Sequence, residues 1–124
     1  MKVNLHPFFS GREFVFKMIL RYGVEEVDRE YNGIGAEWMG ATVRGWLTRL
    51  FPEFEGPCYI HDVRTAWRPI SSTEANRELL KNCRLAALIS KRPHRLMVAA
   101  YAFYLACQIF GAHYSAANNG DDDL

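Results

Sequence analysis

The sequence is short of cysteine and of strand-forming residues. Its three cysteines, Cys58, Cys83 and Cys107, are too few and too scattered for a disulfide framework, and no CxxC spacing suggests a zinc site. We interpret them as buried thiols, with one bridge between them at most. β-branched residues are sparse, so no segment has the composition of a convincing strand.

An excess of charge of either sign is also missing. Lys and Arg number 15 against 14 Asp and Glu, which gives a net charge of +1. Such a balance produces no basic field that would attract nucleic acid, so no nucleic-acid partner is expected. Basic residues gather only in SKRPHR (90–95), which we interpret as a solvated corner between helices, with a phosphate-contacting patch as the alternative. The acidic tail, residues 118–124, is expected to be flexible.

The chain has no apolar run long enough for membrane insertion. The opening residues MKVNLHPFFSGREF lack the apolar centre of a signal peptide. The most apolar segment, residues 96–112, is just shorter than a membrane span and is interrupted by Gln108. We therefore predict a buried helix there, and expect an intracellular protein or part of a particle assembled inside a cell.

Helical patterns occupy most of the remaining sequence. Residues 11–30 carry apolar positions at close to helical spacing, and Gly23 is placed to divide them into two short helices. Residues 42–54 predict a short amphipathic turn or helix, interrupted by Pro52. A further helix is predicted from Pro57, which suits a first helical position, and Pro69 ends it.

The last part of the chain predicts two long helices. SSTE (71–74) is a capping box, in which Ser71 caps the helix and Glu74 stands three residues on. That helix is expected to run to about Lys91, and a second helix begins at Pro93 and continues to about Tyr114. The short turn between them makes the two helices antiparallel. The predicted fold class is mainly α, a small helical domain with two long antiparallel helices and a glycine-rich loop.

The glycine-rich loop is YNGIGAEWMG, residues 31–40. It holds three glycines in ten residues and has no periodicity. Because glycine tolerates positive φ, such a loop can turn several carbonyl oxygens toward one point, as a hard cation like Ca²⁺ requires. The alternative is that Gly33 and Gly35 only make turns.

The segment CYIHD (58–62) places His61 directly before Asp62 inside an apolar stretch. Neighbouring side chains on a helix point about 100° apart, so this pair does not hydrogen-bond as a catalytic triad does. The two side chains can instead serve adjoining subsites, a histidine base and a carboxylate that binds a metal. The alternative is that both are ordinary helix residues.

Taken together, these motifs resemble the phospholipase A₂ superfamily. The loop YNGIGAEW, the segment PCYIHD, the helix EANRELLKNC and the last helix YAFYLACQIFG follow one another in the order of its prokaryotic and phage-encoded members. The resemblance covers residues 31–114. Within a single domain of residues 1–124, it leaves residues 1–30 as a family-variable N-terminal helical segment.

The resemblance implies a Ca²⁺-dependent hydrolase that cleaves the sn-2 ester of phospholipids at a membrane surface. His61 would be the general base that takes a proton from the attacking water. An ordinary histidine pKa near ~6.5 suits this task at neutral pH. Asn76, on the next helix, falls at the position that orients the histidine.

The resemblance also implies a metal site and a lipid-contacting rim. Asp62 would bind Ca²⁺ together with backbone carbonyls around Tyr31, Gly33 and Gly35. The metal and a loop N–H would then stabilise the oxyanion of the tetrahedral intermediate. The apolar rim would be supplied by residues that could equally belong to the core: Trp38, Met39, Trp46, Leu50 and Phe51.

Two residues depart from the family pattern. Asn76 stands where aspartate is usual, so it can accept a hydrogen bond but brings no negative charge to stabilise an imidazolium. In a serine protease, the same exchange lowers kcat by about 10⁴. Thr65 stands where relatives carry a tyrosine. The alternative function is therefore a catalytically weak or inactive homologue that serves as a structural or interaction component of a phage particle, bound to virion proteins or to itself. Either way, we expect it in the host cytoplasm or the phage particle.

The other histidines have no partners at metal-ligand spacing. His6, His94 and His113 are expected to be surface or satisfied residues. Metal phosphohydrolases of the HD type also use adjacent His and Asp, but they need further histidines and an aspartate on other helices. His94 or His113 would have to supply these ligands, and the glycine loop would have no role.

Overall fold

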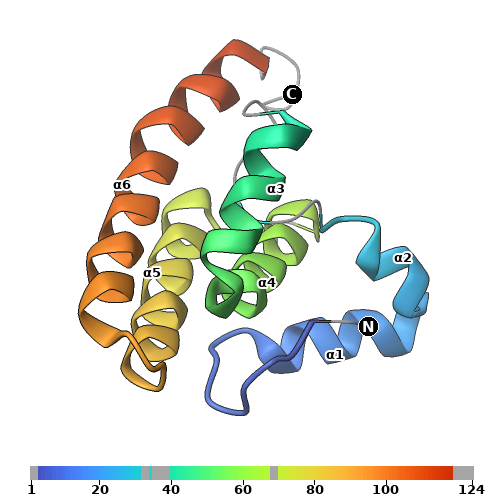
Figure 1. The fold of residues 1–124 in the computed structure, drawn as a ribbon. Coiled ribbons are helices and arrows are strands. Elements are labelled where there is room, and N and C mark those ends of the chain that lie inside the picture. Colours follow the sequence, from blue (N-terminus) through green and yellow to red (C-terminus); the bar gives the residue numbers. More distant parts are fainter. Residues whose placement is uncertain (1–2, 32–33, 35–39, 68–69, 119–124) are drawn as a thin grey trace.

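Helices form the regular structure of the chain, as predicted. The computed structural model describes residues 3–31, 34, 40–67 and 70–118, and no strand occurs in these ranges. Figure 1 shows their arrangement. In order, the elements are α1 (Arg12–Tyr22), α2 (Val24–Asp28), α3 (Ala41–Leu50), a 3-10 turn η2 (Pro52–Phe54), α4 (Glu55–Trp67), α5 (Ser72–Leu88) and α6 (Pro93–Asn118).

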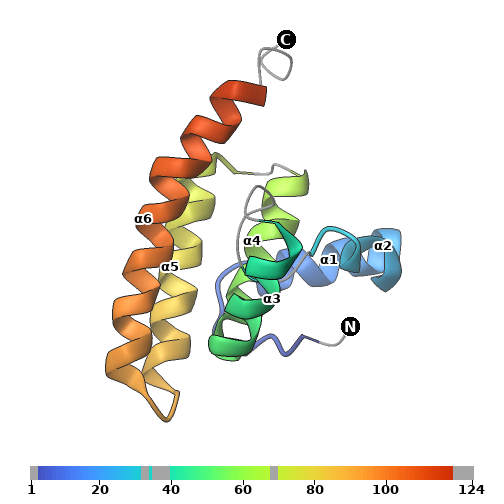
Figure 2. The ribbon, with the colours of Figure 1, turned by 45° about the horizontal axis from the view of Figure 1, so that its top comes forward.

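The two long helices α5 and α6 are antiparallel and lie side by side, as Figure 2 shows. The Ser71 side chain accepts a hydrogen bond from the backbone N–H of Glu74 at 3.2 Å, which confirms the predicted cap. α5 ends at Leu88, short of the predicted Lys91. The first half of the segment SKRPHR, residues 90–92, lies in the corner between the two helices, and α6 begins at Pro93 as predicted.

Gly23 separates α1 from α2, as the sequence predicted. Its φ of 90° lies in the left-handed region, which favours glycine. Its backbone N–H closes α1 by donating to the Ile19 carbonyl at 2.8 Å, and its own carbonyl accepts from the Val27 N–H. The residues before α1 differ from the prediction: residues 3–10 are not helical and form turns that pack on the helices.

α4 begins at Glu55, two positions before the predicted start at Pro57. The 3-10 turn η2 leads directly into it, so the helix is already under way when Pro57 is reached. Pro57 lies in the first turn, where a missing N–H breaks no intrahelical hydrogen bond. The helix ends at Trp67, and Pro69 lies outside the described residues.

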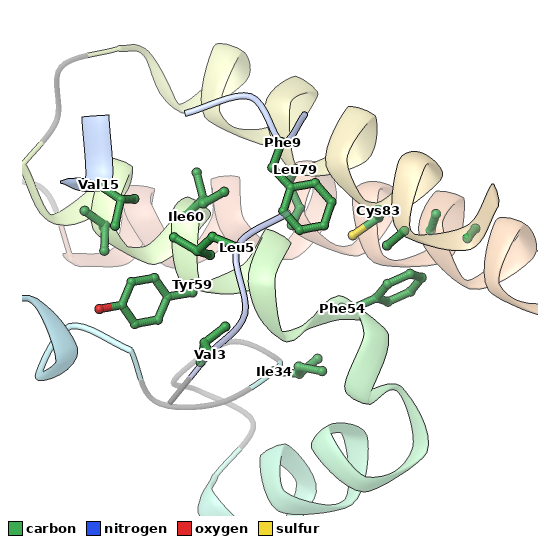
Figure 3. Packing of buried hydrophobic residues seen from close by; sticks show 14 of the residues in the cluster. Val3, Leu5, Phe9, Val15, Ile34, Phe54, Tyr59, Ile60, Leu79 and Cys83 are labelled. Carbon is green, nitrogen blue, oxygen red and sulfur yellow. The ribbon is translucent and has the colours of Figure 1, made fainter. Parts of the chain in front are cut away.

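The core lies between the N-terminal turns, α4 and α5. Gly56 allows the N-terminal segment to come close to α4: a Cβ there would lie 2.7 Å from the Asn4 carbonyl oxygen and 2.8 Å from the Phe9 ring. Ile34, between α2 and α3, is fully buried. Figure 3 shows part of this cluster, which includes Val3, Leu5, Phe9, Val15, Ile34, Phe54, Tyr59, Ile60, Leu79 and Cys83.

The prediction that residues 96–112 form a buried helix is wrong for one face of α6. We define this open face by its exposed apolar side chains, which are Val98, Tyr101, Leu105 and Ile109. α6 packs on α5 through buried Leu96 and Ala100, and no described element covers its opposite side. Since the helix is apolar on every side, its sequence does not show which face is buried.

None of the helices in the described ranges combines the length and hydrophobicity that crossing a bilayer requires. None of the three cysteines forms a disulfide bond. Cys83 is buried, whereas Cys58 and Cys107 are partly buried. Burial, with a smaller contribution from Asp62, raises the pKa of the Cys107 thiol to about 11. The tail beyond Asn118 lies outside the described residues.

Candidate functional site

His61 is the first member of a series of hydrogen bonds that crosses three helices. Its Nε2 lies 2.8 Å from Asn76 Oδ1 on α5, and Asn76 Nδ2 donates to Gln108 Oε1 on α6 at 2.7 Å. Gln108 Nε2 then donates to the Tyr104 hydroxyl at 3.3 Å. We call these four residues the amide relay. The structure thus brings together His61 and Asn76, the two residues to which the sequence assigned catalytic roles.

Local structure explains how the amide relay is assembled. The Ser71 cap sets where α5 begins, which places Asn76 in the first turns of the helix beside buried Ala75 and Leu79. Tyr104 and Gln108 are four residues apart on α6 and therefore share one face. Asn76 is only 8% exposed, and a buried amide is stable only when its polar atoms are bonded, as they are here.

The neutral tautomer of His61 follows from the orientation of the Asn76 amide, whose Oδ1 faces the ring. Asn76 Oδ1 can only accept, so His61 Nε2 is the donor. In the neutral ring, Nδ1 then has the lone pair that can accept a proton. His61 and Asp62 keep 20% and 26% of their side-chain surface exposed, so part of this pair is open to solvent.

Asp62 acts on His61 through its charge. His61 Nδ1 lies 3.8 Å from Asp62 Oδ1, which is longer than a hydrogen bond. Burial lowers the pKa of His61, but Asp62, the Asn76 hydrogen bond and the charge of Glu78 together outweigh it. The pKa of His61 is therefore raised above its ordinary value, and the neutral base forms at a higher pH than in an isolated histidine.

An ion pair beside the amide relay connects α4 to α5. Arg64 Nε and Nη2 donate to the two carboxylate oxygens of Glu78 at 3.1 and 3.2 Å. Ser10 Oγ also donates to Glu78, at 2.8 Å, so the N-terminal turns join the same network. A two-point contact of this kind fixes the relative position of the helices that carry His61 and Asn76.

Thr65, which departs from the pattern that the resemblance implies, forms a hydrogen bond within its own helix. Its Oγ1 donates to the His61 backbone carbonyl at 2.8 Å, one turn back. The hydroxyl is therefore engaged with the helix backbone.

Of the expected metal-binding residues, Tyr31 and Asp62 are described, whereas Gly33 and Gly35 lie outside the described residues. The Tyr31 hydroxyl donates to Glu55 Oε1 at 3.2 Å. Burial is the main cause that raises the pKa of Tyr31, and the charge of Asp62 adds to the rise.

The described side chains of His, Cys, Asp and Glu form no group of three or more that could hold a metal ion. The expected Ca²⁺ site uses one carboxylate and several backbone carbonyls, so such a group is not required for it.

The residues of the expected lipid-contacting rim differ in their surroundings. Trp46 and Leu50 on α3 are exposed. Phe51 instead packs against the rings of Phe54 and Phe103. Trp38 and Met39 lie outside the described residues.

The remaining histidines do not approach the site within the described ranges. His6 Nδ1 accepts a local hydrogen bond from the Phe8 N–H at 3.2 Å. His94 is exposed in the first turn of α6, about 21 Å along the helix from Gln108. His113 lies outside the residues whose side chains are described. His94 is therefore not placed to serve as the metal ligand that the HD-type alternative would need.

Gln108, Tyr104, Arg64 and Glu78 are site residues that the sequence did not reveal. The one signal was Gln108 itself, a polar residue inside an apolar helix. No family model, curated protein or solved structure matches this chain. The resemblance to phospholipase A₂ thus stands on its motifs alone.

Proposed function

We propose that this chain is a phospholipase A₂-like hydrolase in which His61 is the general base. The observation that carries the proposal is the 2.8 Å contact between His61 Nε2 and Asn76 Oδ1. It supports the proposal because an orienting residue on the neighbouring helix that accepts from Nε2 leaves Nδ1 as the proton acceptor.

The proposed reaction is hydrolysis of the sn-2 ester of a phospholipid. His61 Nδ1 takes a proton from water as the water oxygen attacks the ester carbonyl carbon. The tetrahedral intermediate then expels the glycerol oxygen, which takes the proton back from Nδ1. The products are a fatty acid and a lysophospholipid, and His61 returns to its neutral form.

The proposal includes Ca²⁺, which when bound would act as a Lewis acid that stabilises the oxyanion. Asp62 is a partly exposed carboxylate beside the base, and Tyr31 stands at the start of the glycine loop. A carboxylate and a backbone carbonyl are ligands of the kind that Ca²⁺ prefers. The other expected ligands, the carbonyls around Gly33 and Gly35, lie outside the described residues.

An assay of fatty-acid release from mixed phospholipid vesicles tests the proposal. We expect release in the presence of Ca²⁺, and its loss with EDTA or in His61→Ala. His94→Ala is the matched control, because it removes an exposed histidine far from the amide relay. Equal release by the wild type and His61→Ala would contradict the proposed mechanism.

A second candidate function is favoured by the open face of α6. Four apolar side chains exposed on one helix suit an interaction surface better than a solvated one. With the neutral Asn76, this favours a weak or inactive homologue that serves as a component of a phage particle, bound to virion proteins or to itself.

Leu105→Lys tests the second candidate, since it places a charge in the middle of the open face of α6. We expect the wild type to co-purify with particles or to elute as an oligomer in light-scattering chromatography, and the variant to be monomeric. A wild-type monomer that is absent from particles would exclude this function.

A further inference from the structure

The amide relay can be built with its hydrogen bonds in either of two directions. With Asn76 Oδ1 facing the ring, His61 Nε2 donates to Asn76, Asn76 Nδ2 donates to Gln108, and Gln108 Nε2 donates to the Tyr104 hydroxyl. If both amides turned over, Tyr104 would donate to Gln108, Gln108 to Asn76, and Asn76 Nδ2 to His61 Nε2. The proton of the neutral imidazole would then sit on Nδ1, and Nδ1 could not act as a base.

An aspartate at position 76 would accept a hydrogen bond from His61 Nε2 in either orientation, because both carboxylate oxygens only accept hydrogen bonds. An asparagine can present either its accepting oxygen or its donating nitrogen to His61, so a second residue is needed to hold the amide in one orientation. Within the described part of the chain, the second side chain that hydrogen-bonds Asn76 is Gln108, at 2.7 Å.

The carboxylate of Asp62 lies near the other ring nitrogen of His61. Its Oδ1 lies 3.8 Å from His61 Nδ1, and a negative charge there favours a proton on Nδ1. The contact between Asn76 and Gln108 favours a proton on Nε2 instead, because it keeps the acceptor Asn76 Oδ1 in front of Nε2. The two influences compete for a single proton.

We infer that Gln108 is a positioning residue for His61. By accepting a hydrogen bond from Asn76 Nδ2, its Oε1 keeps Asn76 Oδ1 turned toward His61 and keeps the proton of the neutral ring on Nε2. Any effect on catalysis rests on the proposed function, whereas the effect on the imidazole proton does not depend on it.

Two substitutions separate this role from simple packing. Gln108→Met keeps the length of the side chain but removes the acceptor, so Asn76 Nδ2 is expected to turn toward His61. Gln108→Glu keeps the acceptor, and its carboxylate has no N–H with which to reverse the direction of the hydrogen bond to Asn76. Ile109→Met is the matched control, since it introduces the same side chain at the next, exposed position.

The measurement is the pair of imidazole ¹⁵N chemical shifts of His61, recorded where the ring is neutral. We expect the proton on Nε2 in the wild type, Gln108→Glu and Ile109→Met, and mainly on Nδ1 in Gln108→Met. In Asn76→Asp/Gln108→Met the proton should return to Nε2, because a carboxylate accepts from Nε2 in either orientation.

Vesicle hydrolysis adds a kinetic readout. Gln108→Met should lower kcat by about tenfold or more with KM unchanged, since the tautomer and not lipid binding is altered. If the wild type hydrolyses no lipid but the ¹⁵N shifts change as described, the proposed function fails and the positioning role stands.

An unchanged tautomer in folded Gln108→Met would overturn the inference. If that variant does not fold, Gln108→Glu decides the matter, because a proton found on Nδ1 in this variant contradicts the role of the acceptor.

Discussion

His61 is subject to opposing influences on its pKa. Burial lowers it, and the neighbouring charge of Asp62 is the main influence that raises it above the ordinary value. We expect an NMR titration of the imidazole proton signals to show a raised pKa for His61, and a lower pKa in Asp62→Asn. His61→Ala identifies the signal among those of the other histidines.

The same titration tests for Ca²⁺ at Asp62 without any assay of activity. Bound Ca²⁺ would offset the charge of Asp62 and lower the pKa of His61 in the wild type. Asp62→Asn should show no such response. A pKa that does not change with Ca²⁺ in the wild type would contradict a metal site at this carboxylate.

The raised pKa also links folding to pH. A group whose pKa is higher in the folded chain contributes stability below its unfolded pKa, and this contribution is lost as pH rises through the folded value. Urea unfolding across this range should therefore show a smaller pH dependence in Asp62→Asn than in the wild type.

Asn76 is neutral, so it brings no negative charge to the protonated imidazole of His61. Asn76→Asp would place a carboxylate within hydrogen-bond distance of Nε2, and we expect kcat for vesicle hydrolysis to rise by about tenfold or more. No change in kcat would mean that Asn76 does not orient the base during the reaction.

At the level of elements, the ion pair Arg64–Glu78 links α4 to α5. These side chains are 17% and 10% exposed, whereas the comparable pair Arg92–Glu53 is 38% and 29% exposed. We expect Glu78→Gln to lower the free energy of unfolding by about 1–3 kcal/mol, because it weakens a largely buried pair.

Glu53→Gln is the matched control, and a smaller loss is expected, since its ion pair is more exposed. Both changes are measured by urea denaturation. Equal losses in the two variants would show that the Arg64–Glu78 pair has no special role in holding the two helices together.

The sequence predicted elements well where the signal was local. Ser71, Gly23 and Pro93 each mark a helix boundary through their own backbone chemistry, and each is found where it was expected. The buried face of α6 was not predictable, since apolar residues surround that helix on all sides.

The candidate site likewise combines features that are local in the sequence with one contact that is not. The dipeptide His61–Asp62 and the position of Asn76 were visible in the sequence, because they belong to motifs on helices. The Asn76–Gln108 contact spans 32 residues and joins two helices. No periodicity within either helix encodes such a pairing, and it depends on the register in which α5 and α6 pack.

At the scale of the whole molecule, the N-terminal turns belong to the core. A Cβ at Gly56 would lie 2.7 Å from the Asn4 carbonyl oxygen, so Gly56→Ala must displace backbone as well as the Phe9 ring. We expect the free energy of unfolding to fall by about 1–3 kcal/mol, measured by urea denaturation.

Gly45 in α3 provides the control, because a Cβ there meets nothing within 4 Å. Gly45→Ala should raise the free energy of unfolding by about 0.5–1 kcal/mol, as expected for an unobstructed helix position. If both glycines respond alike, the N-terminal segment does not pack closely on α4.

The antiparallel pairing of α5 and α6 has a consequence for the order of folding. The two helices meet first at the corner around Ser90, and Asn76 and Gln108 lie away from that corner. A hairpin that closes from its turn completes such a contact late, and one that frays from its open end loses it early. The site would thus be the last part of the hairpin to form, and hydrogen exchange should show it opening while the rest of the fold persists.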